Sequence, residues 1–82
     1  MFFVYIIYST KNDKYYTGCC SNLEIRLTQH NSGRNISTKS GIPWELMYTE
    51  TLHQLADARK RETEIKKKKS RKYIEWLINE SR

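Results

Sequence analysis

The sequence is poor in cysteine and contains no long hydrophobic run. Its two cysteines, Cys19 and Cys20, are adjacent, and neither has a second cysteine or a nearby histidine at zinc-finger spacing. This argues against a disulfide-stabilised secreted fold and against structural zinc, and it favours packing beside a sheet in a reducing, cytoplasmic compartment. The apolar run near the N-terminus, FFVYIIY, is much shorter than the roughly 18 residues of a membrane span. We therefore expect a soluble protein with no membrane partner.

The 82 residues suit one domain, residues 1–82, and 38% of them are hydrophobic. Six Tyr, two Trp and two Phe provide enough apolar surface for a compact core and argue against disorder. The formal net charge is +6, and the segment RKRETEIKKKKSRK at 59–72 holds nine of the fifteen basic residues. Such a concentration attracts polyanions, usually nucleic acid, although lysine-rich helix faces are often only solubilising. The charge alone leaves both interpretations open.

Patterning along the chain predicts an α+β fold of order ββαβαα. FFVYIIYS is β-branched and aromatic on both faces, which is typical of a central strand, and Asn12-Asp13 provides the tip of a hairpin turn. The expected elements are strands over 2–9 and 15–19, a helix between 21 and 33, a strand over 44–50, and helices from about 52 and after 70. A small mixed sheet with helices packed on it follows from this order.

Local signals mark the ends of these elements. Ser21-Asn22-Leu23-Glu24 has the form of a capping box, and Gly18 is expected to end or bulge the second strand. Three further ends are expected, with Gly33 as a helix C-cap, a cap within residues 51–54 and Ser70 as the N-cap of the last helix.

Three polar side chains fall where a plain amphipathic helix would place aliphatic ones. Glu62 lies in the stripe that Ala58 and Ile65 define, while Arg26 and His30 share one face of the first helix. A carboxylate drawn toward a small core needs an ion-pair partner or a bound cation. A salt bridge from Glu62 to Arg26 or to a neighbouring basic residue, and a role for His30 as a helix cap, are the structural alternatives to a function.

These residue types together match the requirements of phosphodiester hydrolysis. The reaction needs a divalent cation, a cationic group for the added negative charge, a group that deprotonates water, and a positive surface for the strand. Glu62, Arg26, a tyrosine or His30, and the lysine-rich helices can supply these in turn, and a single carboxylate indicates one metal ion.

Four motifs follow one another along the chain: FVY at 3–5, YTG at 16–18, LEIRLTQHNSG at 23–33 and RETEIKK at 61–67. In this order, and over nearly the whole chain, the sequence resembles the GIY-YIG nuclease domain in its small stand-alone form, related to the incision domain of bacterial excinuclease and to structure-specific endonuclease subunits. The resemblance implies a three-stranded antiparallel sheet flanked by helices. It also implies a metal-dependent endonuclease that acts on DNA, with branched or damaged DNA as candidate substrates.

By this resemblance Tyr5 and Tyr16 flank the scissile phosphate, one of them as general base or water-positioning group. Arg26 then stabilises the transition state, Glu62 holds one Mg²⁺ or Mn²⁺, and His30 contacts phosphate or shares the base role. Departures from the family pattern include Phe3 in place of a glycine, Thr17 in place of an isoleucine, and Cys19 where some relatives have an activating lysine. Since an unperturbed tyrosine has a pKa of about 10, the activating group could instead be Arg26, Lys39 or a metal-bound water.

Phosphate contacts are expected to dominate nucleic-acid affinity. The candidate nucleic-acid contacts are Asn31, Lys39, Lys66, Lys67, Lys68, Lys69 and Arg71. A larger partner protein is one candidate source of specificity. Two other functions fit the same residues: a non-catalytic nucleic-acid-binding module, and an adaptor for a larger repair or recombination complex.

Overall fold

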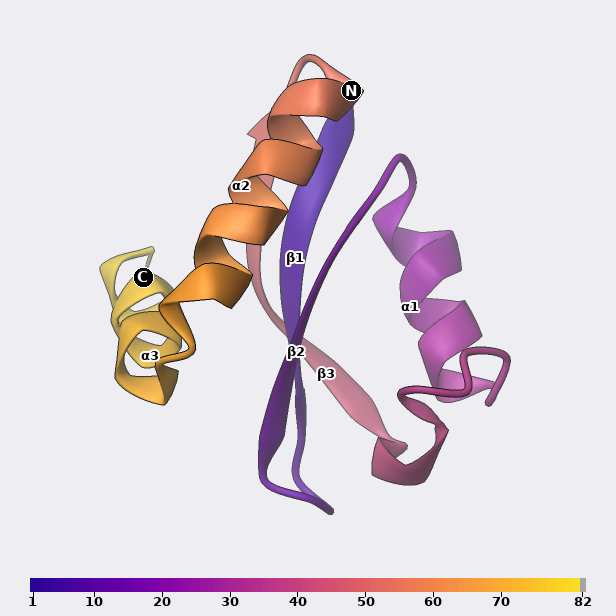
Figure 1. Ribbon diagram of the computed structural model, residues 1–82. Coiled ribbons are helices and arrows are strands. Elements are labelled where there is room, and N and C mark those ends of the chain that lie inside the picture. The colour runs from indigo at the N-terminus through magenta and orange to yellow at the C-terminus, as the bar shows by residue number, and fades with distance from the viewer. Residues whose placement is uncertain (82) are drawn as a thin grey trace.

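The computed structural model describes residues 1–81 as a three-stranded antiparallel sheet with helices on both faces (Figure 1). The elements are β1 (Phe2–Ser9), β2 (Lys14–Cys20), α1 (Leu23–Asn31), the short 3-10 helix η1 (Lys39–Gly41), β3 (Trp44–Leu52), α2 (Leu55–Lys68) and α3 (Arg71–Glu80). The α+β class and the ββαβαα order are confirmed. The sheet is antiparallel throughout, as the family resemblance implied, so the expectation of a mixed sheet is wrong.

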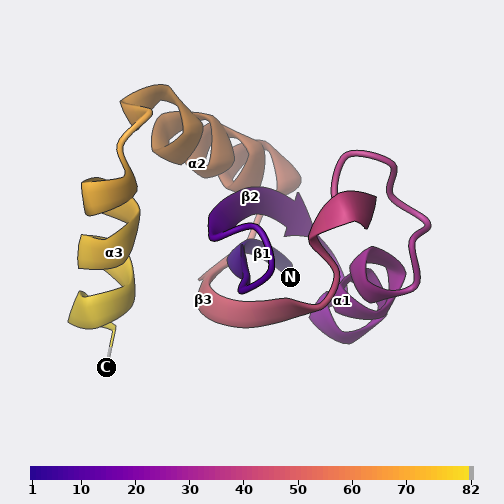
Figure 2. The ribbon, with the colours of Figure 1, turned by 90° about the horizontal axis from the view of Figure 1, so that it is seen from below.

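The sheet has the order β2-β1-β3, which makes β1 the central strand. Side chains alternate along a strand. On β1, Val4 and Ile6 therefore face α2 and α3, whereas Tyr5 and Ile7 face α1. Figure 2 shows the two layers, with α2 and α3 on one side and α1 with its following loop on the other. Both faces of β1 are therefore covered, as its apolar sequence predicted.

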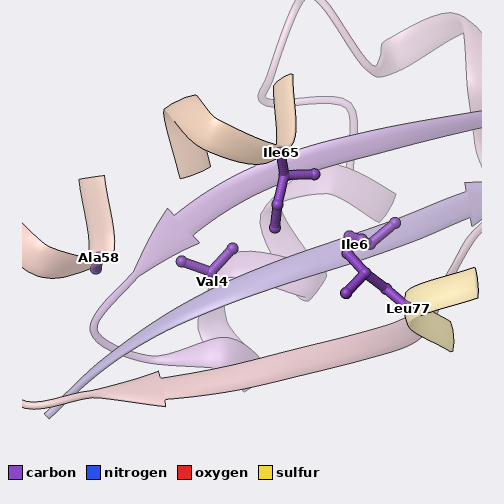
Figure 3. Packing of buried hydrophobic residues seen from close by; sticks show 5 residues of the cluster. All are labelled: Val4, Ile6, Ala58, Ile65 and Leu77. Carbon is purple, nitrogen blue, oxygen red and sulfur yellow. The ribbon is translucent and has the colours of Figure 1, made fainter. Parts of the chain in front are cut away.

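The core between the sheet and the last two helices is purely aliphatic at its centre. Val4 and Ile6 of β1 pack against Ala58 and Ile65 of α2 and Leu77 of α3 (Figure 3). At the apolar positions of α3, Leu77 and Ile78 are buried, as the helical spacing predicted. Within residues 1–81, none of the helices is both long and apolar enough to cross a bilayer.

Two of the predicted helix starts are wrong. Helix α1 is capped by Asn22 instead of Ser21, because the Asn22 side-chain oxygen accepts the Ile25 backbone N–H at 3.0 Å, and Asn is as good a cap as Ser. No side-chain cap forms in residues 51–54, because β3 continues through Leu52 and α2 begins after Gln54, whose side chain makes no capping bond.

The predicted N-cap of α3 is confirmed, whereas the predicted C-cap of α1 is wrong by one residue. The Ser70 hydroxyl accepts the Tyr73 backbone N–H at 3.1 Å and so caps α3. The C-cap of α1 is Ser32, whose backbone N–H donates to the Thr28 carbonyl, and Gly33 follows it with a φ of 81°, a left-handed conformation that suits glycine just after a helix.

The expectation that Gly18 ends or bulges β2 is also wrong. The strand continues to Cys20, and Gly18 pairs regularly with Tyr5 of β1. A Cβ atom at this position would lie 2.5 Å from the Tyr5 hydroxyl oxygen and 2.7 Å from its Cζ atom. Gly18 is therefore needed for the close approach of the Tyr5 phenol to the backbone of β2.

Candidate active site

Tyr5 and His30 are joined by a hydrogen bond inside the layer between β1 and α1. His30, in the last turn of α1, is completely buried, and its Nε2 atom lies 2.8 Å from the Tyr5 hydroxyl oxygen. Its Nδ1 atom lies 2.8 Å from the Thr38 hydroxyl, which also reaches the Asn35 carbonyl oxygen at 3.4 Å. In the tautomer in which the Thr38 hydroxyl donates to that carbonyl and accepts the Nδ1–H, Nε2 accepts the Tyr5 proton.

The electrostatics of this pair favour two neutral groups. Burial, with a smaller contribution from the Arg26 guanidinium, lowers the pKa of His30 below its usual value. Burial also raises the pKa of Tyr5 well above its usual value, while Arg26 acts in the opposite direction. At neutral pH, His30 is therefore an unprotonated acceptor facing a protonated phenol.

Tyr16 of β2 borders the same imidazole. Its ring centroid lies 5.3 Å from that of His30 in an edge-to-face arrangement and 6.4 Å from that of Trp44. Tyr16 is half-buried, whereas Tyr5 is only 3% exposed. The two tyrosines thus meet at His30, with Tyr5 deep in the layer and Tyr16 nearer the surface.

Arg26 lies one helical turn before His30 and is half-buried. Together with Tyr5 and aliphatic side chains of α1, β1 and β3, it lines a narrow hollow between the helix and the sheet. The five ion pairs within residues 1–81 do not include Arg26. The alternative of a salt bridge between Arg26 and Glu62 is therefore not what the structure shows.

Glu62 pairs with a neighbouring basic residue instead. Its Oε2 atom lies 2.6 Å from the Lys66 ammonium one turn along α2, and its side chain is 20% exposed. The same ammonium sits 5.8 Å from the centroid of the Tyr16 ring. On the other side, burial and a hydrogen bond to Glu62 raise the pKa of the Cys19 thiol. Glu62 therefore lies beside β2, and its partner Lys66 lies over Tyr16.

The chemistry of this carboxylate suits one hard divalent cation. Mg²⁺ keeps several waters and binds proteins through one or two carboxylates plus substrate phosphates, and a single carboxylate is what Glu62 offers. Within residues 1–81 there is no cluster of three or more His, Cys, Asp or Glu side chains that could hold a metal on its own. Glu62 can therefore hold such an ion only together with water or substrate, and the Lys66 ammonium competes for it.

The lysine run at the end of α2 is not one continuous face. Lys66 lies over Tyr16, whereas Lys68 lies over Tyr73, with its ammonium 5.3 Å from that ring centroid. Lys67 and Lys69 are exposed. The four lysines are therefore spread around the end of the helix. Of the two that lie over an aromatic ring, only Lys66 lies over a tyrosine of the candidate active site.

The other candidate nucleic-acid contacts have varied surroundings. The side-chain amide of Asn31 is hydrogen-bonded to the backbone of Trp44. It accepts the Trp44 N–H at 2.6 Å and donates to the Trp44 carbonyl at 3.1 Å. Arg71 donates to Asp13 in the hairpin turn, with 2.6 Å between Nη2 and Oδ1. Lys39 is exposed on η1. Contacts from these residues to nucleic acid stay predictions.

Two residues of the site were missed in the sequence. Thr38 orients His30, and Trp44 packs on Tyr16 and donates its indole N–H to the Thr38 carbonyl at 2.7 Å. Neither carries a local signal, because Thr38 lies in a non-periodic polar loop and Trp44 resembles any aromatic strand residue.

Comparison with known proteins agrees with the geometry. The family description "GIY-YIG catalytic domain" matches residues 1–74, and the chain belongs to this family, a family of nucleases. The chain is also similar to small proteins named UPF0213 protein. It is 38% identical to one from Staphylococcus haemolyticus, over 78% of each chain. One from Syntrophus aciditrophicus is 40% identical, over 79% of this chain and 76% of its own.

A third relative, the UPF0213 protein of Clostridium perfringens, is 33% identical over 99% of this chain and 87% of its own. No solved structure matches the chain. The similarity to this relative thus extends over nearly all of the given chain.

Proposed function

We propose that the chain is a metal-dependent endonuclease that hydrolyses phosphodiester bonds in DNA. The observation that carries the proposal is the buried hydrogen-bond chain from Tyr5 through His30 to Thr38, with Tyr16 beside it. A tyrosine paired with a neutral, buried histidine has an acceptor for its proton, which an isolated tyrosine lacks. Such a pair can work as a general base at neutral pH.

In the proposed reaction a water oxygen attacks phosphorus, and the bond from phosphorus to the leaving sugar oxygen breaks. The water proton passes to the Tyr5 oxygen while the Tyr5 proton passes to Nε2 of His30. The Thr38 hydroxyl, 2.8 Å from Nδ1, would hold the imidazole in the required tautomer by accepting the Nδ1–H. The leaving oxygen takes a proton from solvent, and His30 later returns one to solvent.

Arg26 and Glu62 would stabilise the negative charge that develops on the phosphate. The Arg26 guanidinium, near Tyr5 and without an ion-pair partner in residues 1–81, is available to the added negative charge. Glu62 would hold one Mg²⁺ or Mn²⁺, which would supply Lewis-acid stabilisation of the phosphoryl oxygens. Tyr16, nearer the surface, would position the water or the phosphate.

The test is cleavage of a labelled panel of single-stranded, duplex, flapped and branched DNA with Mg²⁺ or Mn²⁺. Glu62→Ala should abolish cleavage, and Tyr5→Phe should lower its rate by about 10²–10⁴-fold, the usual size of general acid–base catalysis. The matched control is Glu64→Ala, which removes an exposed carboxylate of the same helix that pairs with Arg61. It should cleave like the wild type.

Other outcomes separate the alternatives. Salt-sensitive DNA binding without cleavage under any condition would indicate a non-catalytic binding module. Absence of DNA affinity, with salt-insensitive capture of a protein partner, would indicate an adaptor. An RNA panel run in parallel would show which nucleic acid is preferred.

A further inference from the structure

A groove of about 300 Å³ lies next to the candidate active site on the side of α1. It is lined by Arg26 and Gln29 of the helix and by Arg34, Asn35 and Ile36 of the loop that follows. Arg26 also lines the hollow that contains Tyr5. The groove and the candidate active site therefore share one guanidinium.

The positive charge of this groove favours the binding of an anion. Arg26 and Arg34 both face it, and neither belongs to any of the five ion pairs within residues 1–81. Each guanidinium presents paired N–H donors that match the oxygens of a phosphate, so two of them without a carboxylate partner favour binding of a phosphate backbone.

Ile36 lines the same groove and, at 91%, is the most exposed large hydrophobic side chain within residues 1–81. Its neighbours hold the loop in place. The Asn35 side-chain oxygen accepts the Ser37 backbone N–H at 3.1 Å and its hydroxyl at 2.7 Å, and the Thr38 N–H donates to the Asn35 carbonyl at 3.2 Å. The apolar side chain is thus presented to solvent by a hydrogen-bonded loop whose Thr38 also holds His30.

We propose that this groove binds the nucleotide next to the scissile phosphate, with Arg34 on the phosphate of that nucleotide, Arg26 on the scissile phosphate and Ile36 packed against an unstacked base. Apolar wedges, isoleucine among them, are inserted between base steps by proteins that distort DNA. Unstacking costs least where the base is single-stranded, mismatched or at a branch. The substrates favoured are therefore flaps, branches and single strands over continuous duplex. This proposal rests on the proposed nuclease function.

The test uses binding, so that it does not depend on cleavage. DNA duplexes with and without a flap carry a fluorescent base analogue next to the junction, whose emission rises when it is unstacked. They are titrated in EDTA with wild type, Tyr5→Phe, Ile36→Ser, Arg34→Gln, and two controls. The controls are Ile25→Ser, which changes an exposed isoleucine of α1 that does not line this groove, and Lys60→Gln, which removes one exposed charge from α2.

Wild type and Tyr5→Phe should bind the flap more tightly than the duplex and raise the emission. Ile36→Ser should show no rise in emission. Its ratio of flap to duplex affinity should fall about tenfold, equal to about 1.4 kcal/mol, while Ile25→Ser should keep both the rise and the ratio. Arg34→Gln should weaken binding to both substrates more than Lys60→Gln does. The proposal is overturned when Ile36→Ser behaves like Ile25→Ser. Failure of cleavage with an intact Ile36 effect would instead contradict only the nuclease function.

Discussion

Gly18 is a residue whose lack of a side chain shapes the site. The Tyr5 phenol occupies the space that a Cβ atom would need, at 2.5 Å from the hydroxyl oxygen. Real Cβ atoms do not approach so closely, so any side chain at this position must move Tyr5 away from His30. The glycine of the YTG motif is therefore explained by the packing of the FVY tyrosine.

We predict that Gly18→Ala lowers the free energy of unfolding by about 1–3 kcal/mol, the usual cost of overpacking, and lowers cleavage further by displacing Tyr5. Chemical denaturation and the cleavage assay measure the two effects. In a Tyr5→Leu background, where the ring is gone, Gly18→Ala should cost much less stability. Equal costs in the two backgrounds would contradict the steric explanation.

His30 makes the stability depend on pH. Its folded-state pKa is lowered by burial and by Arg26, whereas the unfolded value is about 6.5. Below about pH 6.5 the unfolded chain therefore binds more protons than the folded one, and stability falls as the pH drops further toward the folded pKa.

The measurement is the free energy of unfolding by denaturant between pH 7.5 and 5. Wild type should lose stability across this window, and His30→Gln, although less stable throughout, should show a shallower slope. A wild-type slope in His30→Gln would mean that another group titrates.

At the scale of elements, Asn31 joins the end of α1 to the start of β3. Its amide pairs with both backbone groups of Trp44, so the helix and the strand are linked across the loop that carries Thr38. This arrangement gives Asn31 a structural role beside the nucleic-acid contact predicted for it.

We predict that Asn31→Ala lowers the free energy of unfolding by about 1–3 kcal/mol, because it leaves the Trp44 backbone groups without these partners. Asn79→Ala, at an exposed position of α3, should change stability little. Binding of DNA at several salt concentrations tests the second role: an unchanged salt slope in Asn31→Ala assigns the residue to structure alone.

The pair of Glu62 and Lys66 on α2 leads to a prediction about metal. Because the Lys66 ammonium lies 2.6 Å from the carboxylate, a divalent cation must displace it. Lys66→Ala should therefore increase the rise in melting temperature that Mg²⁺ or Mn²⁺ produces in the absence of DNA, since a ligand that binds more tightly stabilises more.

Lys68→Ala, whose side chain lies over Tyr73 instead, is the matched control and should respond like the wild type. Glu62→Gln should abolish the metal response. If wild type and Lys66→Ala both ignore the metal, Glu62 is only an ion-pair partner.

The sequence predicted elements better than contacts. Strand and helix patterns, the Ser70 cap and the inward position of His30 are local features that periodicity reveals. The N-cap of α1 was missed by one residue because Ser21 and Asn22 are both good caps. The partners of His30, at positions 5 and 38, come together only through tertiary packing, which no local pattern encodes. The ion pair between Glu62 and Lys66 could be predicted from the sequence, since residues four apart on a helix are neighbours.

At the scale of the whole molecule, positive charge lies on both sides of the tyrosines. Arg26 and Arg34 line the groove beside α1, and Lys66, Lys69 and Arg71 line a second groove, of about 320 Å³, between β2 and the junction of α2 and α3. A strand that crosses the site would meet cations before and after the scissile phosphate.

We predict that affinity for DNA falls steeply with salt, because phosphate neutralisation releases counterions. Arg34→Ala and Lys69→Ala, one from each groove, should each reduce the slope of log affinity against log salt by about 1. Their effects should add in the double variant. A slope that changes for only one of the two would show that the strand leaves the site on that side alone.

The position of Trp44 also gives the protein a built-in optical reporter. Of the two tryptophans, Trp76 is 54% exposed on α3, while Trp44 is 8% exposed, packed on Tyr16 and bonded to the loop that orients His30. Trp76→Phe would leave one indole, whose emission should be blue-shifted while the loop is closed. Any ligand or variant that opens the loop would shift that emission to the red, so events at His30 can be followed without an added label.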